Sequence, residues 1–182
     1  MKIIIFSDSH GDVETMYSAV EKEKPEMIIF LGDGIADAVQ LNEKYPDIEM
    51  IKVLGNADSD KEDEEWIKTA EICGKRFIIT HGHKFIGFTF DEELKAFRLT
   101  DESRIKGRAA MIKYMSDNDV DIFLHGHTHE PYINRAEITP EKACWIMNPG
   151  SIRRKDDGAS KPVYGVLKFD KAGAFEWQFK EV

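Results

Sequence analysis

The start of the chain alternates between short apolar runs and amphipathic segments, and this order restricts the folds that the chain can adopt. Apolar runs cover residues 2–6, 27–31 and 48–54. Between them, residues 13–24 and 35–44 fit helices, the first with apolar side chains at helical spacing. Strands that alternate with helices in this way predict a parallel sheet with crossover helices, which is an α/β arrangement.

The second half of the chain is richer in neighbouring strands. Residues 66–72 and 76–80 predict a hairpin around a Gly74-Lys75 turn. Further strands are expected at 121–124 and 144–147, with a terminal hairpin formed by 163–169 and 174–179. A core of two sheets with helices outside fits this pattern best.

The segment at about 85–118 has a different character from the rest. It opens with three aromatic residues, Phe85, Phe88 and Phe90. Helices are expected near 91–98 and 104–117, the second with one apolar face made of Ile105, Ala109, Ile112 and Met115. Two interpretations stay open: the segment forms a helical lid or a dimer contact, or its aromatic side chains pack the helices on the core. The acidic run 58–65 before it predicts a solvated loop or a helix start.

Length and charge bound the class of protein. The 182 residues fit a single domain, 1–182, that is long enough to bury a substantial core. A net charge of −9 disfavours extended nucleic acid and anionic membranes as partners, so we expect a small substrate. The two cysteines lack the spacing of a disulfide framework, and no secretory signal or membrane-spanning run is visible. A cytoplasmic protein is therefore expected.

Each predicted strand is followed by side chains that commonly bind metals. These residues are Asp8 and His10, then Asp33, Asn56, His81 and His83, and finally His125, His127 and His129. Sites in open α/β sheets form outside the carboxyl ends of the strands, so these groups are expected to converge. Each motif alone is an ordinary turn or surface pattern. Five of them in order, each after an apolar strand, indicate a metal site.

The residue types suit a pair of divalent cations. Carboxylate and amide oxygens are hard donors, and neutral imidazole binds manganese, iron, zinc or nickel. Two such ions, roughly 3.5–4 Å apart, can clamp both sides of a phosphoryl displacement. Two aspartates would leave such a centre with a net positive charge, which favours an anionic phosphate.

The motifs "DSH", "GD", "GNAD", "HGH", "GHTH" and "NPGS", in that order, resemble the calcineurin-like metallophosphoesterase superfamily. The chain is most similar to its small, single-domain bacterial and archaeal phosphodiesterase branch. The resemblance extends over nearly the whole chain. It implies a four-layer fold in which two packed mixed β-sheets are flanked by helices.

The resemblance also implies a set of ligands. Asp8, His10 and His129 would hold one metal, Asn56, His81 and His127 the other, and Asp33 would bridge the two. A hydroxide between the ions would attack phosphorus in line, while Asn56 steadies the phosphate oxygens. Manganese is the expected metal, with iron, nickel, zinc and magnesium as alternatives.

The sequence departs from the phosphoprotein phosphatases of this superfamily after Gly55-Asn56. Their leaving-group histidine is absent, and Ala57 and Asp58 follow instead. Asp58 is expected to assist catalysis from behind the ligands or to structure its loop, and His83 is a candidate proton donor. Asp37 is predicted to start a helix.

Three other positively charged or titratable positions have open roles. His125 precedes the matched motif and is expected to pack or to support the ligands. Arg153 and Arg154 follow "NPGS", and one of them could bind a substrate phosphate. The alternative for these arginines is a solvated basic pair.

Together these features predict a dimetal phosphodiesterase that acts on small-molecule phosphodiesters. A phosphomonoesterase or nucleotide pyrophosphatase with the same site is the first alternative. The second is a non-catalytic binding scaffold, because a subunit of the eukaryotic retromer complex has this fold with a compromised site. Here every ligand position holds a competent residue, which favours the enzyme. A homodimer is possible.

Overall fold

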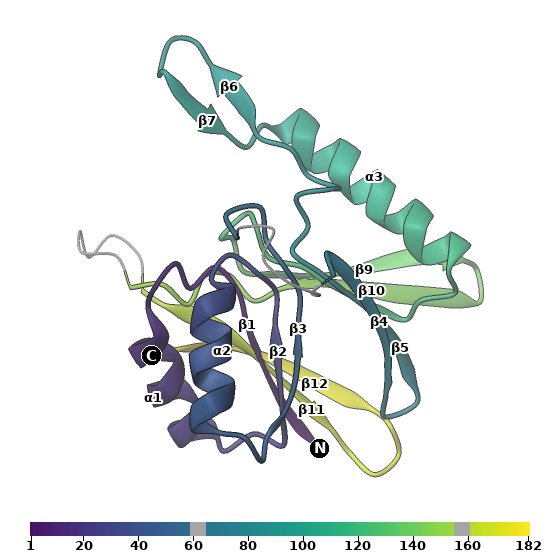
Figure 1. Ribbon diagram of the computed structural model, residues 1–182. Coiled ribbons are helices and arrows are strands. Elements are labelled where there is room, and N and C mark those ends of the chain that lie inside the picture. The colour runs from purple at the N-terminus through teal and green to yellow at the C-terminus, as the bar shows by residue number, and fades with distance from the viewer. Residues whose placement is uncertain (59–64, 155–160) are drawn as a thin grey trace.

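The computed structural model describes residues 1–58, 65–154 and 161–182, and Figure 1 shows the arrangement of their elements. The first sheet has the strand order β12-β11-β1-β2-β3. Its strands are β1 (Lys2–Phe6), β2 (Met27–Phe30), β3 (Glu49–Lys52), β11 (Val163–Phe169) and β12 (Phe175–Glu181). β1, β2 and β3 run parallel, as their order with the helices α1 (Val13–Glu23) and α2 (Ile35–Lys44) predicts.

The second sheet has the order β4-β5-β8-β10-β9 and packs against the first. Its strands are β4 (Ile67–Ile72), β5 (Lys75–Thr80), β8 (Ile122–Leu124), β9 (Tyr132–Thr139) and β10 (Lys142–Asn148). Each sheet mixes parallel and antiparallel pairs.

The alternation of side chains along β1 shows how the layers are held together. Ile3 and Ile5 pack between the two sheets, against residues such as Phe77 of β5. Ile4 and Phe6 point the other way, into the layer formed by α1 and α2. All four side chains are fully buried, which explains why this strand is apolar throughout. The outer face of the second sheet packs against α3 (Asp101–Asp117), so the expected four layers are present.

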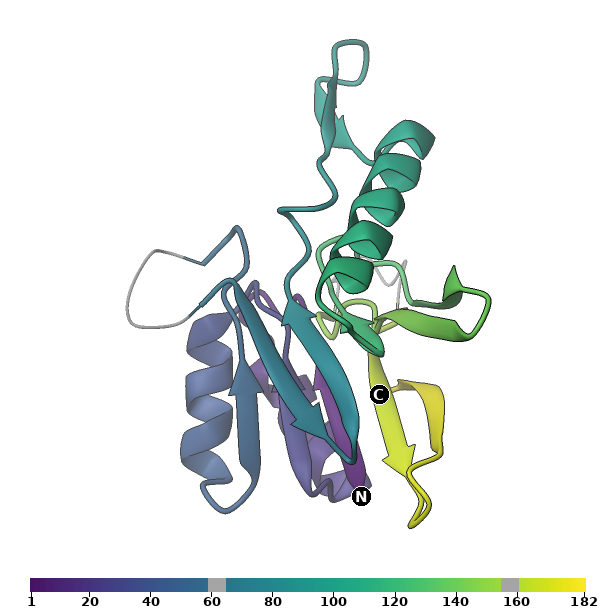
Figure 2. The same cartoon turned by 90° about the vertical axis from the view of Figure 1, so that its right-hand side faces the viewer.

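Residues 91–98 do not form the expected helix. β6 (Thr89–Asp91) and β7 (Ala96–Arg98) form a two-stranded hairpin that projects away from both sheets (Figures 1 and 2). Asp91 Oδ1 accepts hydrogen bonds from the amides of Glu93 and Leu94, at 3.0 and 3.1 Å. With Lys95 in the left-handed region at φ 49°, these contacts favour a turn over a helix.

The buried face of α3 agrees with the prediction only in part, since Met115 and Ile112 pack against the core as expected. Gly107, Met111 and Met115 are buried, whereas Ile105 is 70% exposed. Spacings of four residues select the 107–111–115 face, and Gly107 fits there because a Cβ would lie 2.4 Å from Ile86. A role of this segment as a lid or dimer contact stays a prediction.

The remaining differences concern strand edges and β9, which the sequence pattern did not indicate. β9 is an edge strand whose side chains are mostly polar or half exposed, so its pattern resembles a loop. Most of the acidic run at 58–65, residues 59–64, lies outside the described residues. Within the described ranges, no helix is both long and apolar enough to span a bilayer.

Candidate metal centre

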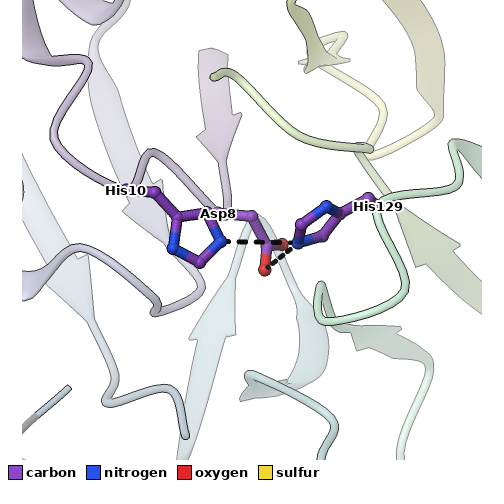
Figure 3. Close-up of side chains that lie close together, drawn as sticks. All are labelled: Asp8, His10 and His129. Atoms are coloured by element: carbon purple, nitrogen blue, oxygen red, sulfur yellow. Dashed lines mark hydrogen bonds and ion pairs between the residues drawn. The ribbon is translucent and has the colours of Figure 1, made fainter. Parts of the chain in front are cut away.

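Asp8, His10 and His129 meet in front of the carboxyl end of β1 (Figure 3). The Nε2 atom of His129 lies 3.1 Å from Oδ1 of Asp8. The Nε2 atoms of the two histidines are 3.5 Å apart, although the residues are 119 positions apart in the sequence. The three ligand atoms are close enough to share one cation.

A second group joins Asp8 to Asp33 and His81, all three of them buried. The Nε2 atom of His81 lies 3.3 Å from Oδ2 of Asp33 and 3.8 Å from Oδ1 of Asp8. The same Oδ2 atom is 3.9 Å from Nε2 of His10. Asp33 therefore lies between His10 of the first group and His81 of the second, while Asp8 belongs to both groups.

Asp8 and His81 each direct a buried polar atom into the site without a hydrogen bond to it from any described residue. Asp8 Oδ1 and His81 Nε2 are buried and have no hydrogen bond within the described part of the chain. The other ring nitrogen of His81 donates to the carbonyl of Leu31 at 2.8 Å, so its Nε2 lone pair is directed at the carboxylates. A lone pair that faces carboxylate oxygens is repelled by them unless a cation lies between. The carboxylates of Asp8 and Asp33 and the imidazole of His81 are donors that fit a divalent metal ion.

The charges of these side chains are strongly coupled. Burial opposes the charged form of Asp33, but its close approach and attraction to His81 lower its pKa overall. Burial opposes the charged form of His81 as well, and its contacts with Asp33 and Asp8 raise its pKa overall. Without a cation, these carboxylates favour a proton on His81. A metal ion would take the place of that proton, and the neutral imidazole would then bind it through Nε2.

The outer oxygen of each aspartate is held by hydrogen bonds, which turns the inner oxygen toward the site. Asp8 Oδ2 accepts from the hydroxyl of Ser7 at 2.5 Å and from the amide of His127 at 3.1 Å. Asp33 Oδ1 accepts from the amide of Ala57 at 2.7 Å. Ser7, which the sequence left without a role, is thus a positioning residue.

The backbone around the site is unusual. Nine non-glycine residues of the described chain have positive φ, and five of them lie at this site: Asp8, His10, Asp33, His127 and His129. Such conformations cost free energy for residues with a Cβ, and they gather where the surrounding structure enforces them. Residues 125–129 are consequently not extended, and His125 does not share a face with His127 and His129 as an extended run would require.

The predicted second ligand set also includes His127 and Asn56, which lie outside the two groups of candidate ligands described above. The ring of His127 lies 5.1 Å from that of His81 and 4.8 Å from that of Phe88, measured between centroids. Burial and then the nearby His81 lower the pKa of His127 to about 4, so its imidazole is neutral at pH 7. Asn56 is exposed on the loop that follows β3.

His83 lies beside the site, with its ring against Trp66 at 4.9 Å and near His81 at 5.6 Å. Burial, followed by the charges of His81 and Lys84, lowers the pKa of His83 to about 4. A neutral imidazole is a poor proton donor at pH 7, which counts against His83 as the general acid.

Asp58 is a positioning residue in this structure. Its Oδ1 accepts from the amides of Gly34 and Ile35, and its Oδ2 from those of Asp33 and Gly55, all between 2.8 and 2.9 Å. The carboxylate is thereby fully used in joining the loops after β2 and β3, so it is not available to act on a substrate. Asp37 lies in the first turn of α2 as predicted.

Asp37 has a second role that the sequence did not indicate. Its Oδ2 accepts from the hydroxyl of Ser9 at 2.6 Å and from the amide of Gly11 at 2.8 Å. The chain on both sides of His10 is therefore fixed to the start of α2. Asp12 caps α1 by accepting a hydrogen bond from the amide of Thr15.

The "NPGS" motif fixes the loop that carries His127 and His129. Asn148 is fully buried and donates to the Gly126 carbonyl at 2.8 Å and to the Thr128 hydroxyl at 3.0 Å. His125, also buried, bonds to the Gly126 carbonyl and to the hydroxyl of Tyr132. His125 thus packs behind the site, as expected, and the motif "NPGS" was the available signal for Asn148.

Arg153, the first of the two arginines after this motif, lines a pocket that also includes His129. Arg154 instead donates its backbone amide to Asp12 at 2.7 Å.

Comparison with known proteins agrees with the fold and with the motifs. Residues 1–172 match the calcineurin-like phosphoesterase superfamily domain. The chain belongs to this superfamily. A probable metallophosphoesterase of Mycoplasma genitalium, MG207, is 21% identical over 164 residues, which is 90% of this chain and 85% of the relative. The family and the relatives together identify the protein as a metal-dependent phosphoesterase, which is an enzyme.

Solved structures of the superfamily share the fold. A predicted phosphoesterase from Streptococcus pneumoniae has a TM-score of 0.68 and 22% identity, covering 99% of this chain and 88% of its own. An archaeal phosphodiesterase has a TM-score of 0.64 and 21% identity, and the match covers 99% of this chain and 100% of the archaeal one. Vps29 of Entamoeba histolytica, complexed with Zn²⁺, has a TM-score of 0.66 and 17% identity. That match covers 100% of this chain and 99% of Vps29.

Proposed function

We propose that this calcineurin-like phosphoesterase is a two-metal phosphodiesterase that hydrolyses small-molecule phosphodiesters. In this proposal Asp8, His10 and His129 hold one cation, and Asn56, His81 and His127 hold the other. Asp33 binds both. The observation that carries the proposal is a pair of buried atoms, Asp8 Oδ1 and His81 Nε2, which have no hydrogen bond within the described residues and lie 3.8 Å apart.

When bound, two divalent cations supply Lewis acidity to the phosphate oxygens and lower the pKa of a coordinated water. Two aspartates balance only half of the four positive charges, so an anionic phosphate is favoured in the remaining space. We assign manganese as the metal, since mixed carboxylate, amide and imidazole donors suit it.

The residues of the chain hold and orient the reacting groups. The Ser7 hydroxyl fixes the direction of the Asp8 carboxylate, and the Leu31 carbonyl fixes the tautomer of His81. Asn56 lies at the exposed edge of the site, where its amide can donate to a phosphate oxygen. We assign His83 a hydrogen bond to the substrate as a neutral imidazole, in keeping with its pKa of about 4.

The alternatives with the same centre are a phosphomonoesterase and a nucleotide pyrophosphatase. The archaeal neighbour of the same fold is a phosphodiesterase, which favours the diester. A cytoplasmic location is proposed as well, because both cysteines, Cys73 and Cys144, are free.

The test uses metal-stripped protein reconstituted with manganese, iron, nickel, zinc or magnesium. Each form is assayed on aryl phosphodiesters, aryl phosphomonoesters, cyclic nucleotides and dinucleoside polyphosphates, and its bound metal is measured by elemental analysis. The proposal expects about two ions per chain and the highest kcat/KM on diesters with manganese. Stoichiometric metal without hydrolysis of any substrate would overturn it, as would hydrolysis that survives chelation.

A further inference from the structure

A pocket of about 300 Å³ opens beside His129 and is distinct in composition from the metal centre. It is lined by His129, Pro131, Ser151, Arg153, Lys161, Val163 and Glu181. Pro131 and Val163 supply apolar walls, and the two cations Arg153 and Lys161 supply positive charge. Since His129 belongs to both, a molecule bound at the metal centre can extend directly into this pocket.

The backbone that carries Arg153 is fixed to the metal centre. The hydroxyl of Ser151 donates to the Asp8 carbonyl at 2.8 Å and accepts from the amide of Arg153 at 3.3 Å. On either side, the amide of Ile152 donates to the Ser7 carbonyl and that of Arg154 donates to Asp12. Arg153 therefore projects from a rigid segment whose position is set by the residues around the first metal ligands.

The two positively charged side chains of the pocket, Arg153 and Lys161, differ in how freely they can bind an anion. Within the described ranges, the guanidinium of Arg153 has no hydrogen-bond or ion-pair partner. Lys161 pairs with Glu181 at 2.7 Å, but both side chains are more than half exposed. Such surface pairs contribute little stability, so the ammonium group can turn to a stronger anion at low cost.

We propose that this pocket binds a second phosphate group of the substrate, with Arg153 as its main ligand and Lys161 as a supplementary one. This inference rests on the proposed function. An exposed guanidinium with no partner can form two parallel hydrogen bonds to phosphate oxygens, which a lysine cannot. The preferred substrate is then a phosphodiester that carries a further phosphate, and Glu181 weakens its binding by competing for Lys161.

The closing experiment compares two nucleoside substrates that differ by one phosphate. They are the 5′-p-nitrophenyl ester of thymidine 5′-phosphate and the same ester with an added 3′-phosphate. The KM of the bisphosphate is expected to be lower with the unmodified enzyme. Arg153→Ala should raise that KM about tenfold, as loss of a charge-assisted hydrogen bond does, and change the KM of the other ester less than about twofold.

Two further variants make the comparison specific. Arg154→Ala removes the same charge from the neighbouring position and retains the backbone amide, so both KM values should stay within about twofold. Glu181→Gln frees Lys161 and should lower the KM of the bisphosphate alone. Equal effects of Arg153→Ala and Arg154→Ala, or an equal effect of Arg153→Ala on both esters, would overturn the inference.

A binding measurement separates this inference from the proposed function. Calorimetry with thymidine 3′,5′-bisphosphate and thymidine 5′-phosphate needs no turnover. If neither ester is hydrolysed, a preference for the bisphosphate that Arg153→Ala abolishes still supports the pocket, and the phosphodiesterase proposal alone fails. If both esters are hydrolysed and no such preference exists, the pocket proposal alone fails.

Discussion

The carboxylate of Asp58 accepts a 2.9 Å hydrogen bond from the backbone amide of Asp33, so the loop after β3 fixes the carboxylate at the centre of the site. Asp33 in turn binds the loop after β3, because its Oδ1 accepts a hydrogen bond from the amide of Ala57 at 2.7 Å. These reciprocal bonds hold Asp33 in its left-handed conformation at φ 59°. The position of Asp33 therefore depends on Asp58, a residue outside both groups of candidate metal ligands.

This relationship predicts that Asp58→Ala destabilises the protein and loosens the metal centre together. Four backbone amides lose their acceptor, and we expect a loss of about 2 kcal/mol in the free energy of unfolding because water can reach some of them. Metal affinity should fall by about 10- to 100-fold, as it does when groups that orient ligands are removed. Urea unfolding and metal titration measure the two effects.

Asp58→Asn tests whether the position acts through structure or through proton transfer. Its amide oxygen can still accept hydrogen bonds, so stability should be intermediate between the unmodified protein and Asp58→Ala. The pH profile of kcat at saturating metal should keep its shape in both variants. A missing limb in that profile would instead identify Asp58 as an acid or base.

Asp33→Asn is predicted to abolish hydrolysis. A neutral amide bridges two cations poorly, so both metals should bind more weakly and kcat/KM should fall by at least about 100-fold. The control is Asp47→Asn, the same loss of charge at an exposed position before β3. Hydrolysis rates and bound metal are measured for both variants, and near-normal activity of Asp33→Asn would refute the role of this carboxylate.

Much of the site was predictable because its side chains follow apolar strands. Asp8 and Asp33 follow β1 and β2, parallel neighbours whose ends share one edge of the first sheet. His81 follows the buried part of β5 in the second sheet, which packs against the first. The alternation of apolar and helical segments likewise predicted the parallel order of β1, β2 and β3.

Most of the contacts that hold these side chains could not be predicted from the sequence, although a loop role for Asp58 was one of the two expected. The contact between Ser151 and Asp8 joins residues 143 positions apart, and no local pattern encodes it. The role of Asp58 depends on the left-handed turn at Asp33, a conformation imposed by tertiary contacts. The sequence predicts a helix where β6 and β7 form a hairpin. The hydrogen bonds from the turn amides to Asp91 stabilise the hairpin more than helical propensity favours a helix.

Lys24→Gly is predicted to stabilise the protein. Lys24 ends α1 in the left-handed region at φ 49°, where glycine has no steric cost. The hydrogen bond from its backbone amide to the Val20 carbonyl is retained in the variant. We expect a gain of about 0.5–1 kcal/mol in the free energy of unfolding. Lys22→Gly, inside the same helix, should lose a similar amount. Chemical denaturation measures both, and a loss in Lys24→Gly would contradict the prediction.

Gly126→Ala is predicted to displace the Asp8 carboxylate. A Cβ at this position would lie 1.8 Å from the Ser7 hydroxyl and 2.7 Å from Asp8 Oδ2, which is closer than these atoms can approach. The cost should be about 1–3 kcal/mol of stability, with weaker metal binding. Gly87→Ala is the matched control, since its Cβ would meet nothing within 4 Å. Thermal unfolding with and without metal distinguishes the two, because only Gly126→Ala should lose the stabilisation that metal provides; equal metal stabilisation in both variants would show that Asp8 does not bind the ion.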